Sequence, residues 1–115
     1  MQTKLIRLLH QNGFSALPPV RMLKQLSDRY STSECSVGSG WLLSAETVGW
    51  VQAGYPKVLA ALPFACLPGH IYGRGQYTAL QRRLPRSLIV GIDYDASIRD
   101  GTVQTRIQML LDEPV

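Results

Sequence analysis

Two continuous apolar runs constrain the fold of this chain more than any other feature of its sequence. They are Val-Leu-Ala-Ala-Leu at residues 58–62 and Leu-Ile-Val-Gly-Ile at residues 88–92. Such runs are typical of strands that are covered on both faces in a parallel sheet. Between them, Tyr77, Leu80 and Leu84 recur at helical spacing. The order strand, helix, strand therefore predicts a right-handed βαβ unit with two parallel strands.

Four further helices are predicted around this unit. Apolar spacing and helix-terminating residues place them over residues 3–12, after Pro18-Pro19, from Ser44 to Gly54, and from about Thr102 to Leu111. We expect Ser44 to cap the third helix, because its hydroxyl can accept a hydrogen bond from a first-turn amide. In the last helix, Asp100 is the expected cap and the expected inward positions are Val103, Ile107 and Leu110.

The length of 115 residues and the hydrophobic fraction of 45% fit one domain with a modest core. We expect a single domain over residues 1–115, with a helical part over about 3–54 and the βαβ part with the final helix over about 57–111. The predicted fold class is a small, three-layer-like α/β domain whose short parallel sheet is flanked by helices. Because two strands leave two open sheet edges, this is an incomplete Rossmann-like lobe. We expect a protein partner, a second copy of the chain, or an unrecognised weak strand to complete the sheet.

The sequence favours a cytoplasmic protein that makes no use of a membrane. Its most apolar run, Val58–Leu67, is about half the roughly 20 residues that a spanning helix needs. Arg7 and His10 interrupt any apolar segment of a secretory signal. The two cysteines, Cys35 and Cys66, are far apart and form no disulfide scaffold. Cys35 lies in a polar stretch, and we assign it no role.

The charge is unevenly distributed along the chain, whose formal net charge is +4. No carboxylate lies between Glu46 and Asp93, whereas five basic residues do: Lys57, Arg74, Arg82, Arg83 and Arg86. The Arg74–Arg86 segment could therefore bind an anion, such as the phosphates of coenzyme A or a nucleic acid backbone. The alternative is a solvated helix face. Only Tyr72 and Tyr77 lie nearby, and so few aromatic residues do not favour nucleic acid.

Polar residues follow both predicted strands where each one ends. Cys66 and His70 come after the first strand, and Asp93 and Asp95 come after the second. Because the carboxyl ends of parallel strands meet at one edge of the sheet, we expect these four side chains at a common rim. Each one also has a structural interpretation. Cys66 could be a small buried apolar residue, His70 could bond a backbone group, and the aspartates could cap turns.

Three chemistries are open for this rim. Cys66 could be a thiolate ligand of iron or zinc, in which case a second chain must supply the remaining ligands. Cys66 could instead be a nucleophile with His70 as its base. The third alternative is a phosphate-binding loop, in which Gly69, Gly73 and Gly75 precede a helix and Arg74 lies beside them. The glycine spacing does not match a dinucleotide fingerprint.

Three segments carry a resemblance to a known family. They are Gly-Ser-Gly-Trp-Leu-Leu-Ser-Ala-Glu at 38–46, Pro-Phe-Ala-Cys-Leu-Pro-Gly-His at 63–70, and Ile-Asp-Tyr-Asp at 92–95. They resemble the C-terminal part of the acyl-CoA dehydratase activase-related proteins, which are linked to the 2-hydroxyglutaryl-CoA dehydratase system. The likeness covers roughly residues 3–111 and is most specific in the second segment.

The resemblance implies iron–sulfur chemistry in anaerobic metabolism. In that system an ATP-driven activator passes a low-potential electron to a dehydratase-like partner that binds a cluster through cysteines. Carried over to this chain, it implies Cys66 as a candidate cluster ligand, with His70 and Asp93 lining the site. We therefore expect a detached lobe that is no autonomous enzyme and that contributes to an iron–sulfur or acyl-CoA site shared with a partner.

The chain also departs from the family pattern at several positions. Ser39, Leu62, Ala65 and Gly69 stand where the family usually has Glu, Gln, Gly and Asn. Residues 96–99 replace Pro-Gly-Ala-Ser, and Thr105 replaces an Asn. Several polar groups that the family has around the cysteine are thus missing from this chain.

Overall fold

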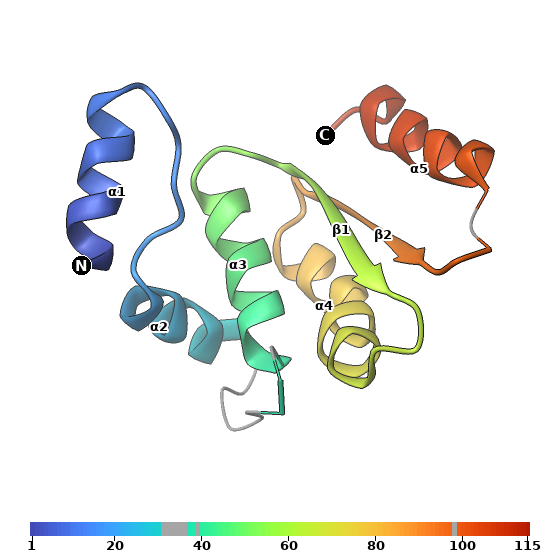
Figure 1. The fold of residues 1–115 in the computed structure, drawn as a ribbon, viewed down its shortest axis with the longest axis horizontal. Coiled ribbons are helices and arrows are strands. Elements are labelled where there is room, and N and C mark those ends of the chain that lie inside the picture. Colours follow the sequence, from blue (N-terminus) through green and yellow to red (C-terminus); the bar gives the residue numbers. More distant parts are fainter. Residues whose placement is uncertain (31–36, 39, 98) are drawn as a thin grey trace.

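The predicted strand–helix–strand unit forms the centre of the fold (Figure 1). The computed structural model describes residues 1–30, 37–38, 40–97 and 99–115. Within these residues, β1 (Lys57–Pro63) and β2 (Leu88–Tyr94) make a two-stranded parallel sheet. Lys57 pairs with Leu88 at one end and Pro63 with Tyr94 at the other. The prediction of a small α/β domain built on a short parallel sheet is confirmed.

The connection after β1 is helical almost throughout. A π-helical segment, η1 (Gly69–Arg74), runs directly into α4 (Gly75–Arg83). The predicted glycine-rich loop over Gly69, Gly73 and Gly75 is therefore wrong. A Cβ atom on Gly73 would lie 3.1 Å from the Tyr77 hydroxyl and 3.5 Å from Leu43, so this glycine allows η1 to pack closely.

The helix α3 (Gly40–Gln52) begins earlier than the sequence predicted. Ser44 is not a cap: it lies inside the helix, is fully buried, and donates its hydroxyl hydrogen to the Tyr72 carbonyl at 2.8 Å. This bond joins α3 to η1. The apolar side chains of Trp41, Leu42 and Leu43 are partly buried, and their burial favours the extra turn.

The remaining helices match the prediction closely in position. They are α1 (Gln2–Gln11), α2 (Val20–Tyr30) and α5 (Asp100–Asp112). The expected cap at Asp100 is wrong, because the capping position is Arg99 and no side chain there bonds an amide. Leu110 is buried as predicted, but Ile107 is exposed. No described helix is both long and apolar enough to cross a membrane.

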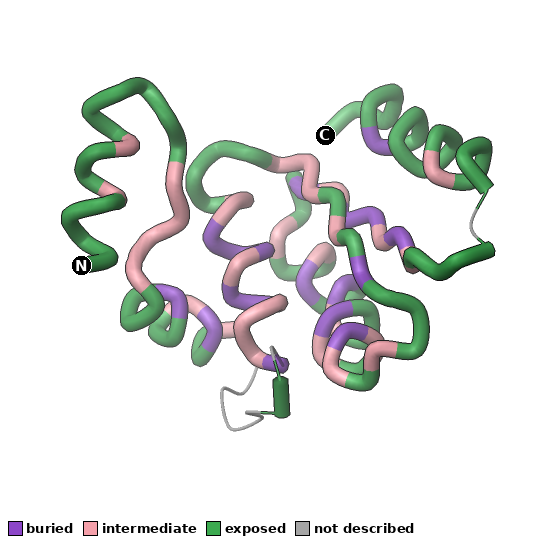
Figure 2. Tube along the Cα trace, viewed as in Figure 1, coloured by how far each residue is buried: buried purple, intermediate pink, exposed green. Residues whose placement is uncertain are grey.

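Helices cover the two faces of the sheet unequally. The packing of α3 and α4 against one face buries Val48, Tyr77, Leu80 and Ile89, which form the main core (Figures 1 and 2). On the other face, α5 packs against the sheet. Leu59 on β1 stays 38% exposed. The expectation that both strands are covered on both faces is therefore wrong for β1.

Candidate functional site

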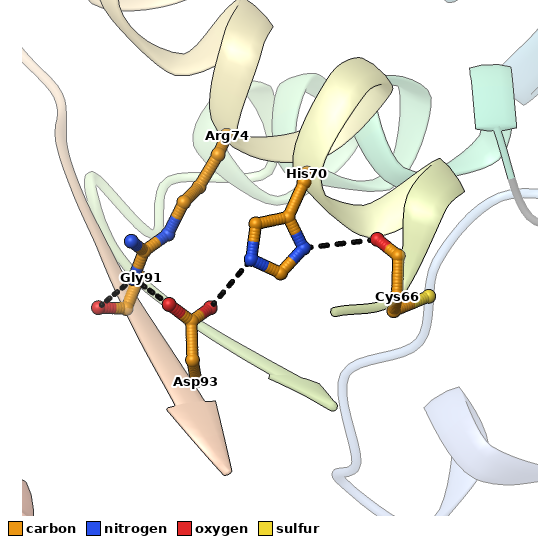
Figure 3. Close-up of polar contacts among 5 residues, drawn as sticks. All are labelled: Cys66, His70, Arg74, Gly91 and Asp93. Carbon is orange, nitrogen blue, oxygen red and sulfur yellow. Dashed lines mark hydrogen bonds and ion pairs between the residues drawn. The ribbon is translucent and has the colours of Figure 1, made fainter. Parts of the chain in front are cut away.

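Three ionisable side chains, those of His70, Arg74 and Asp93, meet at the carboxyl end of the sheet. Asp93, near the end of β2, lies opposite Leu62 in the register and faces η1. Arg74 Nη2 is 2.9 Å from Asp93 Oδ2, and His70 Nε2 is 3.8 Å from Asp93 Oδ1 (Figure 3). The Asp93 side chain is only 19% exposed. The structure thus brings together His70 and Asp93, two of the four residues predicted at this rim, and adds Arg74 from the predicted phosphate-binding loop.

Gly91 allows Arg74 to reach this position. The Arg74 guanidinium lies across β2 and also donates to the Gly91 carbonyl at 3.2 Å. A Cβ atom at Gly91 would lie 3.1 Å from Arg74 Nε, so a larger residue would displace the side chain. This contact could not be predicted from the sequence, in which Gly91 is only one member of an apolar run.

His70 is held by a backbone contact on one side of its ring. Its Nδ1 is 2.9 Å from the Cys66 carbonyl oxygen, which can only accept, so Nδ1 carries the proton. Nε2 then faces Asp93, whose Oδ1 is buried and has no hydrogen-bond partner among the described residues. A proton on Nε2 would complement this oxygen.

The thiol of Cys66 does not join these residues. Figure 3 shows its Sγ directed away from His70 and Asp93, while its backbone carbonyl points into the site. The expectation that this thiol converges with the aspartates is wrong. The Cys66–His70 nucleophile–base pair is likewise not formed, since the two ring nitrogens face a carbonyl and a carboxylate. The turn preceding Cys66 contains Ala65 at φ +59°, which sets the direction of the chain there.

The described residues do not make up a metal or cluster site by themselves. They contain no group of three or more His, Cys, Asp or Glu side chains that could hold a metal ion. Cys66 offers a single thiolate, and Cys35 lies outside the described residues. An iron–sulfur cluster on this lobe would take its other ligands from a partner.

A polar cleft of about 380 Å³ adjoins the site beyond β2. Its charged and hydroxyl-bearing lining includes Arg74, Asp93, Asp95, Ser97, Arg99 and Arg106. Asp95 accepts hydrogen bonds from the Ser97 amide and hydroxyl at 2.7 and 2.8 Å. No described residue pairs with the side chain of Arg99 or Arg106. These two arginines were missed as site residues. Arg99 precedes α5 with an extended backbone and Arg106 lies within the helix, so helical spacing does not indicate that they share a site.

The basic segment that the sequence singled out does not act as one surface. Arg74 and Arg83 stand at opposite ends of α4, about 13 Å apart along the helix axis. Arg83 donates to the carbonyls of Arg29 and Tyr30 at 3.2 and 3.0 Å and so caps the end of α2. Lys57 similarly donates to the Leu111 carbonyl at 2.7 Å, near the end of α5.

Tyr77 completes the surroundings of the site. Burial raises the pKa of its phenol above the usual value; the nearby Arg74 charge lowers this pKa and Asp93 raises it. The phenol therefore stays protonated at neutral pH. Its side chain is buried in the main core.

A larger cavity, of about 670 Å³, lies between β2 and α5. Leu88, Val90 and Met109 contribute to its lining, and none of the sequence-predicted site residues does. Of the sequence-predicted site residues, Arg74, Asp93 and Asp95 line the smaller cleft instead.

Comparisons of the chain with family models, with curated proteins and with solved structures give no match in any of the three.

Proposed function

We propose that this chain is a ligand-binding lobe, not catalytic alone, that holds an anionic group in the cleft beyond β2. The observation that carries the proposal is the presence of Arg99 and Arg106 in this cleft without a carboxylate partner among the described residues. Guanidinium groups bind phosphate through paired hydrogen bonds and remain charged at every physiological pH. Arg74 adds a third cation whose position is fixed by Asp93.

Coenzyme A thioesters are the ligand class that fits this proposal best. Their phosphates suit the arginines, and their hydroxyl and amide groups can donate hydrogen bonds to the exposed carboxylate of Asp95. The exposed rings of Phe64, directly after β1, and of Tyr94, the last residue of β2, offer apolar contact at the same end of the sheet. The site so proposed keeps His70, Arg74, Asp93 and Asp95 from the sequence prediction and adds Arg99 and Arg106. Gly73 and Gly75 are not part of the proposed site, because they lie in the helical segments η1 and α4. The N–H groups at the end of η1 already donate to the His70 and Gly73 carbonyls and do not face a ligand.

Calorimetric titration with coenzyme A tests this function. Arg106→Gln should weaken binding by about tenfold or more, because it removes a charge-assisted hydrogen bond worth about 1.5–3 kcal/mol. Arg82→Gln is the matched control, since Arg82 is also exposed but lies on α4 outside the cleft. Binding should also weaken as salt is raised. The absence of any heat of binding, or an equal loss of affinity in the two variants, would contradict the proposed function.

A second candidate function is a contribution of Cys66 to an iron–sulfur cluster shared with a partner in the cytoplasm. The supporting observation is that Cys66 is a free, partly exposed thiol turned away from the ion pair. Phe64 and Leu67, on either side of it, are each 62% exposed, so a partner could cover this turn. Such a cluster would supply low-potential electron transfer, and the chain would contribute one ligand.

Anaerobic reconstitution with iron, sulfide and an excess of a small thiol, which can supply the ligands that this chain lacks, tests the second candidate. Iron and sulfide bound by the chain should fall in Cys66→Ser and remain in Cys35→Ser. Equal retention of iron by the wild-type chain and by Cys66→Ser would contradict the proposal that Cys66 binds a cluster.

A further inference from the structure

The two outer edges of the sheet differ in what their backbone groups contact. Leu88 N–H donates to the Pro56 carbonyl, and Phe64 N–H donates to the Tyr94 carbonyl, both at 2.8 Å. In a parallel ladder the residues of one strand alternate between facing the neighbouring strand and facing outward. With the observed register, the N–H and C=O groups of Leu59 and Ala61 therefore point to the outer edge of β1.

The outer edge of β2 is already occupied by a side chain. By the same alternation, the outward carbonyl at its centre belongs to Gly91, and it accepts a hydrogen bond from Arg74. The Arg74 guanidinium packs directly against this backbone. A further strand could not pair there without displacing Arg74. At β1, in contrast, no described residue bonds the outward groups of Leu59 or Ala61.

A groove runs along this free edge of β1. It has a volume of about 200 Å³, and the successive β1 residues 58–62 line it on one side. The other side is α3, which contributes Leu43, Glu46 and Trp50. Glu46 has no partner among the described residues, and burial raises the pKa of its carboxyl above the usual value. The groove thus combines a row of unpaired backbone groups with one unpaired carboxyl.

We propose that this edge of β1 binds an extended segment of a partner protein as an added strand, and that the segment carries a Lys or Arg side chain that pairs with Glu46. Strand addition supplies the backbone partners that Leu59 and Ala61 lack, and side-chain pockets along the groove supply specificity. This inference identifies the kind of partner that the proposed lobe requires, and in that respect it rests on the proposed function.

A second copy of the chain fits the groove less well. If the β1 strands of two copies paired about a twofold axis, each strand would keep the same side chains on the same face of the joined sheet. The second copy would therefore direct Val58, Ala60 and Leu62 toward α3. These side chains are apolar and bring no cation to Glu46. The unpaired carboxyl is the feature that favours a basic partner segment over self-association.

The test uses backbone NMR with a blocked peptide, Val-Thr-Lys-Thr-Val, whose lysine and valines share one face. In the free protein, the amides of Leu59 and Ala61 should exchange rapidly, while those of Ala60 and Leu62, which bond β2, exchange slowly. Saturation with the peptide should slow exchange at Leu59 and Ala61 at least tenfold. The same peptide with Glu in place of Lys should give no such protection.

Variants then separate the ion pair from the strand pairing. Glu46→Gln should weaken binding of the lysine peptide about tenfold, whereas the exposed Glu113→Gln should leave it unchanged. Slow exchange at Leu59 and Ala61 without peptide, protection that grows with protein concentration, or equal binding of both peptides would overturn the proposal. Coenzyme A titration of the same samples reports on the cleft beyond β2, so failure of one site is distinguishable from failure of the other.

Discussion

The ion pair between Arg74 and Asp93 joins the end of the π-helical segment to the end of the second strand. The two side chains meet at 2.9 Å, and the same guanidinium also bonds the Gly91 carbonyl. One residue therefore fixes the carboxylate of the site and blocks the outer edge of β2. This double contact makes Arg74 a structural residue as well as a candidate ligand contact.

Loss of Arg74 should lower the stability of the fold. Arg74→Ala leaves the Asp93 carboxylate, which is largely shielded from solvent, without its cation. We expect the free energy of unfolding to fall by about 1–2 kcal/mol, a value kept small because Arg74 itself is partly exposed. Urea denaturation measures the change. Arg82→Ala should change stability by less than about 0.5 kcal/mol, and an equal loss in both variants would show that the pair contributes nothing.

Ala65 should be replaceable with a gain in stability. It has φ +59°, a left-handed conformation in which a Cβ atom costs roughly 1–2 kcal/mol. Ala65→Gly removes that strain, but glycine also gives the unfolded chain more conformational freedom, which offsets part of the stabilisation. We therefore expect the free energy of unfolding to increase by about 0.5–1 kcal/mol. Thermal denaturation reports it. Ala79→Gly, at an exposed position within α4, should instead destabilise by about 1 kcal/mol; a loss in both variants would contradict the assignment of strain.

Glu46 should make stability depend on pH in the acidic range. Burial raises the pKa of its carboxyl in the folded chain above the unfolded value, so folding favours the protonated form. The stabilisation from this group is present below the unfolded pKa and is lost as pH rises through the folded one. Glu46→Gln should therefore be more stable than the wild type at pH 7, with the difference shrinking below about pH 4. Urea denaturation of both proteins at pH 7 and below about pH 4 tests this prediction. A difference in the free energy of unfolding that stays constant between the two conditions would show that titration of Glu46 does not cause it.

The strands and most helices could be predicted from the sequence because they depend on local patterns. The apolar runs gave β1 and β2, and the Asn12-Gly13 and Gly54 signals gave the ends of two helices. The close packing of η1 depends on the contact of Gly73 with Leu43 on α3, which only the tertiary structure brings together. Local glycine content therefore indicated a loop where close packing produces a helix.

The candidate site was predictable only in part. Parallel strand ends correctly placed His70 and Asp93 near each other, because topology decides which residues share an edge. Topology does not decide where a side chain points, and the Cys66 thiol is turned away by the bend at Ala65. Arg99 and Arg106 reach the cleft because α5 packs across the sheet, a placement that spacing along the chain does not contain.

The most direct test of the account is a map of amide chemical shifts as coenzyme A is added. The account predicts that the perturbed amides cluster at Asp93, Asp95, Arg99 and Thr102, around the polar cleft. Perturbations centred instead on Leu88, Val90 and Met109, in the larger cavity between β2 and α5, would contradict it, as would no perturbation at all.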